Sequence, residues 1–232
     1  MAAVDTTPYW STTARIARVG SLSGDLKADV VVIGGGITGL TTAYLLTKAG
    51  AKVAVLERAR FAGADTGHTS AHLTCITDLR LGEMVKTFGR NHAQAAWDAG
   101  LAAINRIHQV VEEERLECGF AWVPGYLHAS QALKRDREQI ASLERDARLA
   151  AEMGFDATFL DRVPLMDCPG IRFANQARFH PRKYLAGLLE VLRKKGCHLF
   201  EQSEISEVEV DPPESPELQP TATKASMPTA NS

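Results

Sequence analysis

Residues 28–40 read Ala28-Asp-Val-Val-Val-Ile-Gly-Gly-Gly-Ile-Thr-Gly-Leu40, a β-branched run that passes directly into three consecutive glycines. The apolar run predicts a buried strand, and the Gly34-x-Gly36-x-x-Gly39 spacing after it predicts a tight turn into a helix. A second apolar run, Lys52-Val-Ala-Val-Leu-Glu57, follows and ends in an acid. Together these stretches predict a βαβ unit with a dinucleotide-binding fingerprint.

Each residue type in this fingerprint has a mechanical reason. Gly34 permits the turn out of the strand, Gly36 lets a pyrophosphate approach the backbone, and Gly39 lets the helix pack close to the strand. The helix N-terminus offers N–H groups and a positive dipole end to the phosphates. Glu57 lies 18 residues beyond Gly39. We therefore expect its carboxylate to accept hydrogen bonds from ribose hydroxyls and to repel the 2′-phosphate of NADP.

Two other interpretations of this stretch are a glycine-rich turn in an ordinary α/β protein and a membrane span. Residues 30–47 carry no charge and contain Gly35-x-x-x-Gly39, as some spanning helices do. Three consecutive glycines are unfavourable in such a helix, however, and Asp29 and Lys48 leave only a short, threonine-rich segment between them. The context of strand, helix, strand and acid favours nucleotide binding.

The composition limits the classes of protein to consider. A chain of 232 residues can form one sizeable domain or two small ones, and its net charge of −2 gives no indication of a nucleic-acid or membrane partner. The N-terminus has no basic region or apolar run, so we expect no signal peptide. The four cysteines have no Cys-x-x-Cys spacing, which favours reduced thiols in a cytoplasmic protein over disulfides or a metal site: Cys75, Cys118, Cys168 and Cys197.

The pattern along the chain predicts five parts. They are a lead-in (1–27), a nucleotide-binding βαβ unit with a loop rich in Gly, Thr, Ser and His (28–80), a helical second domain (81–174), a return to the first domain (175–210), and a disordered tail rich in Pro, Ser and Thr (211–232).

Periodicity and punctuation predict the individual elements. We expect helices over 37–48, 91–115, 131–153 and 181–195, two short strands around Pro124-Gly125, and further strands over 157–160, 198–201 and 205–210. His180 precedes Pro181, a residue suited to the first turn of a helix. We therefore expect His180 to cap that helix or to fill a packing position, not to act in catalysis.

Three stretches resemble a known family. They are Asp29 to Leu40, Thr66-Gly-His-Thr-Ser-Ala-His-Leu-Thr74, and Asn175-Gln-Ala-Arg-Phe-His-Pro-Arg-Lys-Tyr-Leu185. The chain resembles the N-terminal portion of FAD-dependent oxidoreductases of the D-amino-acid oxidase and glycine oxidase superfamily, from about Pro8 to about Val210. It looks most like a bacterial type that can carry a C-terminal Rieske domain.

The resemblance implies an α/β fold: a Rossmann-like FAD/NAD(P)-binding domain with part of an α+β substrate domain. It assigns the pyrophosphate to Gly34, Gly36, Ile37, Thr38 and Gly39, and the adenosine ribose to Glu57 with Arg58 beside it. It assigns the flavin ribityl chain and ring to Thr66, Gly67, His68, Thr69, Ser70 and Ala71. Without the resemblance, an alternative interpretation of this last segment is a Thr/Ser-rich turn that satisfies its own backbone.

The histidines of this segment leave alternatives open. Some amine dehydrogenases of the superfamily attach flavin covalently through a histidine in the corresponding loop, so His68 is a candidate for such a bond or for a simple hydrogen bond near the flavin or surface. The role of His72 is equally undecided. His68 and His72 have i,i+4 spacing, but the loop composition argues against a helix there, and no metal site is predicted.

The resemblance implies oxidation of an amine or amino-acid C–N bond by hydride transfer to the flavin, which supplies the difficult chemistry. The substrate would be a small molecule, and the electron acceptor stays open between oxygen, a quinone and a partner protein. No catalytic side chain is identified, and the Gly-x-Ser-x-Gly motif of serine hydrolases does not occur.

Full members of the family are considerably longer, and no Rieske ligand motif occurs here. We therefore expect a truncated gene product, a gene-model fragment or a partial sequence. Two competing functions remain: a non-catalytic nucleotide-binding or interaction fragment, and a nicotinamide-dependent dehydrogenase that shares the glycine motif.

Overall fold

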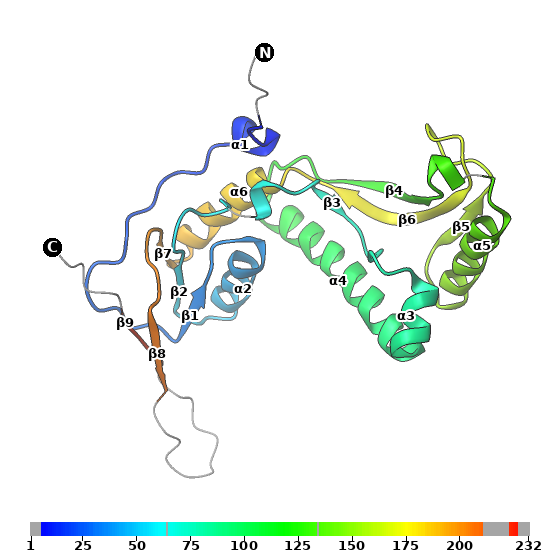
Figure 1. Cartoon of the computed structure of the whole chain (residues 1–232). Helices are drawn as coiled ribbons and strands as arrows, with labels where there is room; N and C mark the ends of the chain where they lie inside the picture. Colours follow the sequence, from blue (N-terminus) through cyan, green and yellow to red (C-terminus); the bar gives the residue numbers. More distant parts are fainter. Residues whose placement is uncertain (1–5, 64, 134, 211–222, 227–232) are drawn as a thin grey trace, which may run out of the picture. The chain divides into compact units, whose positions relative to one another are not determined.

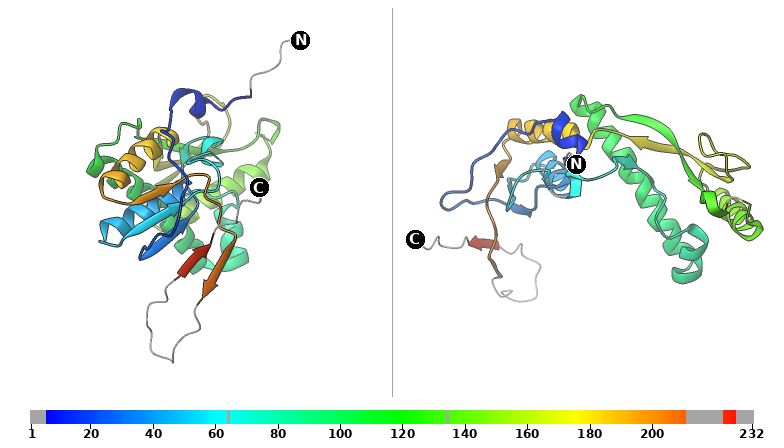
Figure 2. Two further views of the ribbon diagram at one scale, coloured as in Figure 1. Left: turned by 90° about the vertical axis from the view of Figure 1, so that its left-hand side faces the viewer. Right: turned by 45° about the horizontal axis from the view of Figure 1, so that its top comes forward.

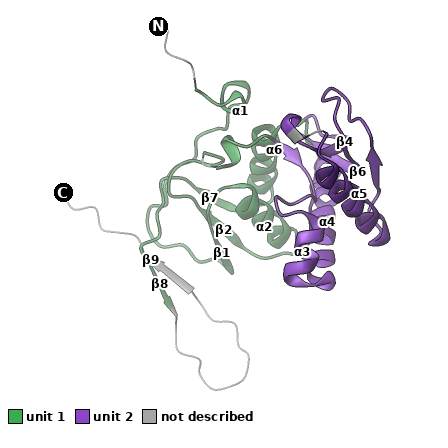
Figure 3. Ribbon diagram, turned by 45° about the vertical axis from the view of Figure 1, so that its right-hand side comes forward, with its two compact units in different colours: residues 1–70, 116–118, 180–232 green, residues 71–115, 119–179 purple. Residues whose placement is uncertain are grey.

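The computed structural model describes residues 6–63, 65–133, 135–210 and 223–226. The chain forms two compact units, coloured separately in Figure 3. The first comprises residues 1–70, 116–118 and 180–232, and the second comprises residues 71–115 and 119–179. Each unit is described by itself.

A three-stranded parallel sheet forms the centre of the first unit. Its strands lie in the order β1 (Val30–Ile33), β2 (Val53–Leu56) and β7 (His198–Phe200). Every residue of β2 is buried, as expected for the central strand of a sheet covered by helices. Because the strands are parallel, their carboxyl ends meet at one edge, where Glu57 and Glu201 follow β2 and β7 directly.

Two helices pack against each other beside this sheet, α2 (Ile37–Lys48) and α6 (Pro181–Lys194), as Figures 1 and 2 show. The bounds of α2 are those predicted from the sequence. Pro181 opens α6, and the His180 side chain caps it by accepting a hydrogen bond from the Lys183 N–H at 3.2 Å. The expectation that His180 caps a helix is therefore confirmed.

Short elements complete the first unit. A helix of five residues, α1 (Tyr9–Thr13), lies in the lead-in, and a 3₁₀ turn, η1 (Asp65–Gly67), lies in the predicted flavin segment. Strand β8 (Glu207–Val210) pairs antiparallel with β9 (Thr223–Ser226). The rest of the predicted disordered tail, 211–222 and 227–232, lies outside the described residues.

The second unit contains an antiparallel sheet built around β6 (Gly170–Arg178). Strand β4 (Ala121–His128) pairs along one edge of β6, and β3 (His72–Leu73) and β5 (Ala157–Leu160) pair with it as well. The prediction of two short strands around Pro124-Gly125 is wrong, since β4 is one strand whose register shifts between Val123 and Gly125. Pro124 lacks an N–H for the ladder, and the irregularity accommodates it without ending the strand.

Three helices belong to the second unit: α3 (Leu81–Phe88), α4 (Arg90–Glu114) and α5 (Arg137–Glu152). Trp97 of α4 lies in the core and makes edge-on ring contacts, with centroids 5.1 Å from Phe155 and 5.7 Å from Phe173. Helix α5 begins later than predicted because Asp136 caps it, accepting from the Gln139 N–H at 2.8 Å. A separate 3₁₀ turn, η2 (Gln131–Leu133), precedes it.

Candidate cofactor-binding site

The turn between β1 and α2 depends on glycine for two different reasons. Gly34 has a φ of +105°, a conformation that side chains of L-residues rarely adopt, and its N–H donates to the Leu56 carbonyl at 2.9 Å. A Cβ built on Gly39 would stand 2.0 Å from the Gly34 carbonyl oxygen. The backbone at Gly34 and the packing at Gly39 therefore both require glycine.

Gly35, which the motif leaves unspecified, is also required by packing. A Cβ there would stand 2.2 Å from the ring of Phe61, a side chain only 1% exposed. The Gly35 carbonyl accepts from the Ala62 N–H at 3.0 Å, so the loop after β2 is bound to the glycine turn. The sequence pattern gave no indication of this contact, because Phe61 lies in a segment without periodicity.

Gly36 differs from its neighbours. Its φ of −84° is open to any residue, and a Cβ there would meet a single described atom within 4 Å, Thr66 Oγ1 at 3.5 Å, an ordinary contact. Neither the backbone nor the packing of the described residues explains a glycine at this position. A group outside the chain that approaches the backbone would explain it, and Gly36 is where the fingerprint places a pyrophosphate.

The N-terminus of α2 faces the same place. The first N–H groups of an α-helix have no acceptor within the helix and carry the positive end of its dipole. The Ile37 N–H lies 3.4 Å from Thr66 Oγ1, a long contact, and Thr38 is exposed. These donors suit a phosphate group, since they need no charged side chain to bind an anion.

Glu57 turns its carboxylate toward the glycine turn. Oε2 accepts from the Gly35 N–H at 2.7 Å, and Oε1 accepts from the Ala59 N–H at 2.8 Å. A carboxylate has about four acceptor positions, so about two remain for ribose hydroxyls. The two backbone contacts hold the carboxylate in place before any ligand binds. Arg58 is exposed beside it.

The predicted flavin segment has a fixed part and an exposed part. Thr66 lies in η1 and directs its hydroxyl toward Gly36 and Ile37, and Gly67 is buried where a Cβ would stand 3.2 Å from the Ala62 carbonyl oxygen. His68, Thr69 and Ser70 are exposed. Ala71 is buried at a φ of +62° and belongs to the second compact unit.

The structure therefore brings together, within the first unit, the predicted residues Gly34, Gly36, Ile37, Gly39, Glu57, Thr66 and Gly67. It leaves Thr38, Arg58, His68, Thr69 and Ser70 exposed around them. This arrangement can hold an anion at the helix N-terminus and a diol at Glu57, the two groups that an adenosine diphosphate presents in sequence. The residues present thus fit the ADP half of FAD.

Glu201 supports this site and was not predicted. Its carboxylate is 1% exposed; Oε1 accepts from the Phe61 N–H at 2.8 Å and lies 3.2 Å from Arg60 Nε, and Oε2 accepts from the Val19 N–H at 3.2 Å. It holds the loop that places Phe61 under Gly35. A signal existed in the sequence, because Glu201 directly follows a parallel strand, as Glu57 does.

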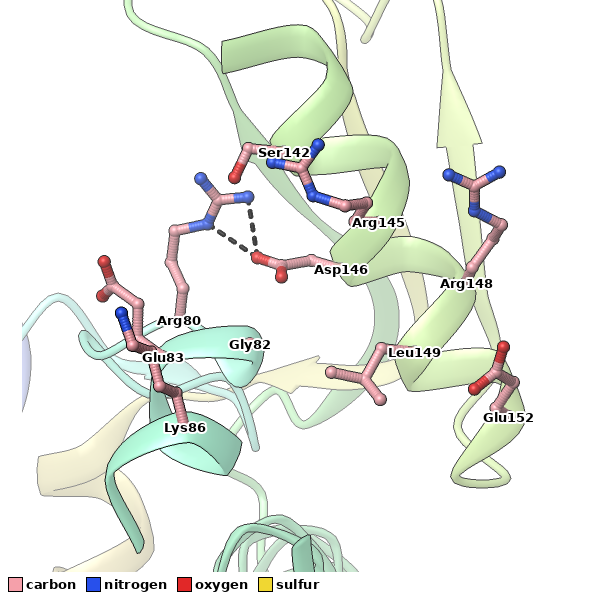
Figure 4. A pocket seen from close by; sticks show the side chains of 10 residues that line it. All are labelled: Arg80, Gly82, Glu83, Lys86, Ser142, Arg145, Asp146, Arg148, Leu149 and Glu152. Carbon is pink, nitrogen blue, oxygen red and sulfur yellow. Dashed lines mark hydrogen bonds and ion pairs between the residues drawn. The ribbon is translucent and has the colours of Figure 1, made fainter. Parts of the chain in front are cut away.

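A cavity lies elsewhere, in the second unit. It has a volume of about 580 Å³ and is lined by four basic and three acidic side chains of Arg80, α3 and α5, shown in Figure 4. Nε and Nη2 of Arg80 both lie 2.7 Å from Asp146 Oδ2, an ion pair that joins the start of α3 to α5. None of the predicted cofactor residues lines this cavity, and we interpret the pair as structural.

Other site chemistries find little support in the described part of the chain. No group of three or more His, Cys, Asp or Glu residues is placed there to hold a metal ion. None of the described helices combines the length and the apolar character that a membrane crossing requires. All four cysteines are buried, and none of them forms a disulfide.

Comparison with known proteins places these features in a family. The family model described as FAD dependent oxidoreductase matches residues 29–224. The protein YhfW of Bacillus subtilis (strain 168), named as a Rieske 2Fe-2S iron-sulfur protein, is 32% identical over 197 residues, which cover 84% of this chain and 38% of that protein. The gamma-glutamylputrescine oxidoreductase of Escherichia coli (strain K12) is 24% identical over 210 residues, covering 88% and 49%.

The fold has solved relatives. Glycine oxidase from Geobacillus kaustophilus matches with a TM-score of 0.63 at 15% identity, over 78% of this chain and 48% of that one. An L-amino acid deaminase from Proteus myxofaciens matches with a TM-score of 0.64 at 16% identity, over 84% and 43%. The chain thus spans less than half the length of each of these proteins. The predicted fold class is confirmed, and the chain belongs to the family of FAD-dependent oxidoreductases that includes D-amino-acid oxidase.

Proposed function

We propose that this chain binds FAD through the glycine turn of its first unit and serves an oxidoreductase that acts on a small amine or amino acid. Gly36 is the observation that carries the proposal. Of the four glycines at positions 34, 35, 36 and 39, it is the one that neither backbone conformation nor packing of the described residues accounts for. A pyrophosphate approaching its backbone accounts for it directly.

Each neighbouring group has a task in this proposal. The N-terminus of α2 offers N–H donors to the pyrophosphate, and Glu57, held by Gly35 and Ala59, accepts from the adenosine ribose hydroxyls. The Thr66 hydroxyl, between Gly36 and Ile37, is placed to contact a phosphate oxygen or the ribityl chain. We assign the remaining contacts with the flavin half to residues 68–71.

When bound, FAD would accept a hydride from the carbon that bears the substrate nitrogen. This chain's part in that reaction is to bind and orient the cofactor. The substrate class rests on the names of the relatives, which include an oxidoreductase for gamma-glutamylputrescine, a glycine oxidase and an L-amino acid deaminase. We assign no side chain the role of a general base, and we leave the electron acceptor open.

The test is a titration of the purified chain with FAD and, separately, with NAD⁺, followed by visible absorption and flavin fluorescence. We expect FAD to bind and NAD⁺ to bind at least about tenfold more weakly, a difference of about 1.4 kcal/mol. Tight binding of NAD⁺ without FAD would instead support the nicotinamide-dependent dehydrogenase. Binding of neither nucleotide would refute the proposal for this chain.

Acid precipitation of the flavin-loaded chain tests whether the flavin is attached covalently. Flavin released into the supernatant means a non-covalent cofactor, which fits the exposed position of His68. Colour that stays in the pellet, and is lost in His68→Ala, would assign the covalent bond to His68.

A further inference from the structure

Trp10 connects the N-terminal lead-in to the segment assigned to the flavin. Its indole Nε1 donates to the Thr69 carbonyl at 2.7 Å, across 59 residues of sequence. Trp10 lies in α1, a helix of five residues that buries none of them. A helix this short is not stable alone. Other contacts must therefore hold Trp10 in its place against Thr69.

His180, at the start of α6, supplies such contacts. Its ring packs edge-on against the Trp10 indole with centroids 4.8 Å apart, and the Tyr9 ring lies 6.3 Å away. Its Nε2 lies 2.9 Å from Thr13 Oγ1. One histidine thus contacts three of the five residues of α1.

Arg182, in the first turn of α6, holds both the segment after α1 and the loop after β2. Its Nε donates to the Ala14 carbonyl at 3.2 Å, directly after α1, and its Nη1 donates to the Ala62 carbonyl at 2.9 Å. Ala62 in turn contacts the site, since its N–H donates to the Gly35 carbonyl and its carbonyl packs against Gly67. The first turn of α6 therefore anchors both the lead-in and the loop that supports the glycine turn.

The hydrogen bonds define the protonation state of His180. Nδ1 accepts from the Lys183 N–H at 3.2 Å, so it carries no proton. The Thr13 hydroxyl donates to the Tyr9 carbonyl at 2.7 Å, so toward His180 its oxygen accepts. The network therefore assigns the proton of a neutral imidazole to Nε2. A second ring proton, on Nδ1, would face the Lys183 N–H and abolish the cap.

The surroundings of His180 oppose that second proton. From α6 it faces Arg182 and Lys183, from α1 it faces the uncharged Tyr9, Trp10 and Thr13, and its backbone N–H donates to the Cys118 carbonyl at 2.7 Å. Burial and then the charge of Lys183 lower the pKa of His180, a backbone hydrogen bond raises it, and the charge of Arg182 lowers it; the net shift is downward. A positive charge would also lie at the positive end of the α6 dipole.

We propose that Trp10 and His180 are positioning residues for the cofactor loop, residues 66–70, and that this loop loses its anchor when His180 becomes doubly protonated. The inference rests on the proposed FAD site, because it assigns a task to residues that hold that site and touch no cofactor atom themselves. It predicts that FAD affinity falls as the pH drops below the pKa of His180.

The first test measures the Kd for FAD between about pH 7.5 and pH 5.5 with the full chain. Trp10→Phe keeps the ring and removes the N–H donor, so we expect about fivefold weaker binding at pH 7.5, the effect of one neutral hydrogen bond. Tyr9→Phe, which keeps the ring beside Trp10, is the matched control and should bind as the unaltered chain does.

The second variant tests whether the titration of His180 causes the pH dependence of FAD binding. His180→Asn retains a side-chain oxygen that can cap α6 but cannot titrate. We expect the Kd of the unaltered chain to rise as the pH falls through the pKa of His180, and that of His180→Asn to change less than about twofold over the same range. His198→Asn, which removes an exposed histidine of β7, should keep the pH dependence of the unaltered chain.

A flavin-free readout separates this inference from the proposed function. The Trp10 indole N–H resonance, assigned by its loss in Trp10→Phe, should titrate with a midpoint below the ordinary histidine value of about 6.5, and should not titrate in His180→Asn. If the resonance titrates but the chain binds no FAD at any pH, the proposed function is refuted, whereas the anchoring of the loop through Trp10 and His180 is not. An FAD affinity unchanged in Trp10→Phe, or equally pH-dependent in His180→Asn, would overturn the positioning roles.

Discussion

Gly39 lies so close to Gly34 that a single methyl group on Gly39 would stand 2.0 Å from the Gly34 carbonyl oxygen. This contact packs the first turn of α2 against the end of β1. Packing therefore requires glycine at position 39. At position 36 a Cβ would make no such close contact, so packing does not require glycine there. Substitutions at the two positions should therefore affect different properties.

Gly39→Ala should destabilise the first unit. The new methyl group meets backbone atoms, which cannot move aside without displacing α2, and overpacking of this kind costs about 1–3 kcal/mol. The free energy of unfolding from urea titration measures the effect. Gly20→Ala is the matched control, since nothing lies within 4 Å of a Cβ there, and it should change the free energy by less than about 0.5 kcal/mol.

Glu57→Gln should weaken FAD binding by at least about tenfold. The amide that replaces the carboxylate has one acceptor oxygen where Gly35 and Ala59 now use two, and it presents N–H groups to one of those donors. Hydrogen bonds to a charged group contribute about 1.5–3 kcal/mol, which sets the expected loss. Fluorescence titration with FAD measures it. Glu204→Gln, at an exposed site, should bind FAD unchanged; equal affinities in both variants would remove Glu57 from the site.

Asp146→Asn should lower the stability of the second unit. Asp146 is 8% exposed and pairs with Arg80, whose guanidinium would lose its counter-charge in a partly buried place. Leaving a buried polar group unpaired costs about 1–3 kcal/mol. Glu190→Gln, which removes the exposed pair with Arg193, should cost less than about 1 kcal/mol. If the two variants unfold alike in urea, the Arg80–Asp146 pair contributes no more than a surface pair.

The thiols of Cys75 and Cys197 should react slowly in the folded chain. Burial raises the pKa of both, which keeps them protonated near neutral pH, and the thiolate is the reactive form. The folded chain keeps these thiols protonated to a higher pH than the unfolded chain does. Their contribution to the free energy of unfolding is therefore present below the ordinary thiol pKa and is lost as the pH rises above it. Ellman's reagent at pH 8, with and without denaturant, checks the reactivity. Fast labelling of the folded chain would contradict the burial.

Local patterns predicted the elements that define the nucleotide-binding unit. The helix Ile37–Lys48 has the predicted bounds, because Gly36 and Gly50 punctuate a helical sequence at both ends. The strands at 53–56 and 157–160 were also indicated by short apolar runs. The second unit was harder to predict. Helix α3 and strand β6 were not predicted, since β6 is defined mainly by its pairing with β3, β4 and β5, which are distant in sequence.

The candidate site likewise contains some residues that local patterns predicted and others that they did not. Gly34, Gly36, Gly39 and Glu57 were identified because their spacing along the chain reflects the geometry of one βαβ unit. Glu201, Arg182 and Trp10 were not assigned a part in the site, because their contacts join segments more than 50 residues apart. The roles of residues 66–71 toward the flavin stay a prediction, as do the domain boundaries expected from composition.

Titration of Gly36→Ala with FAD, alongside the unaltered chain, tests the central claim most directly. The methyl group meets no atom closer than ordinary contact, but Gly36 is the N-cap of α2, where Ala is less favourable than Gly, so the free energy of unfolding should fall by no more than about 1 kcal/mol. It occupies the place proposed for the pyrophosphate, so FAD affinity should fall at least about tenfold. Unchanged FAD affinity in a stably folded Gly36→Ala chain, or a loss of affinity that only accompanies a loss of stability, would contradict a pyrophosphate site at Gly36.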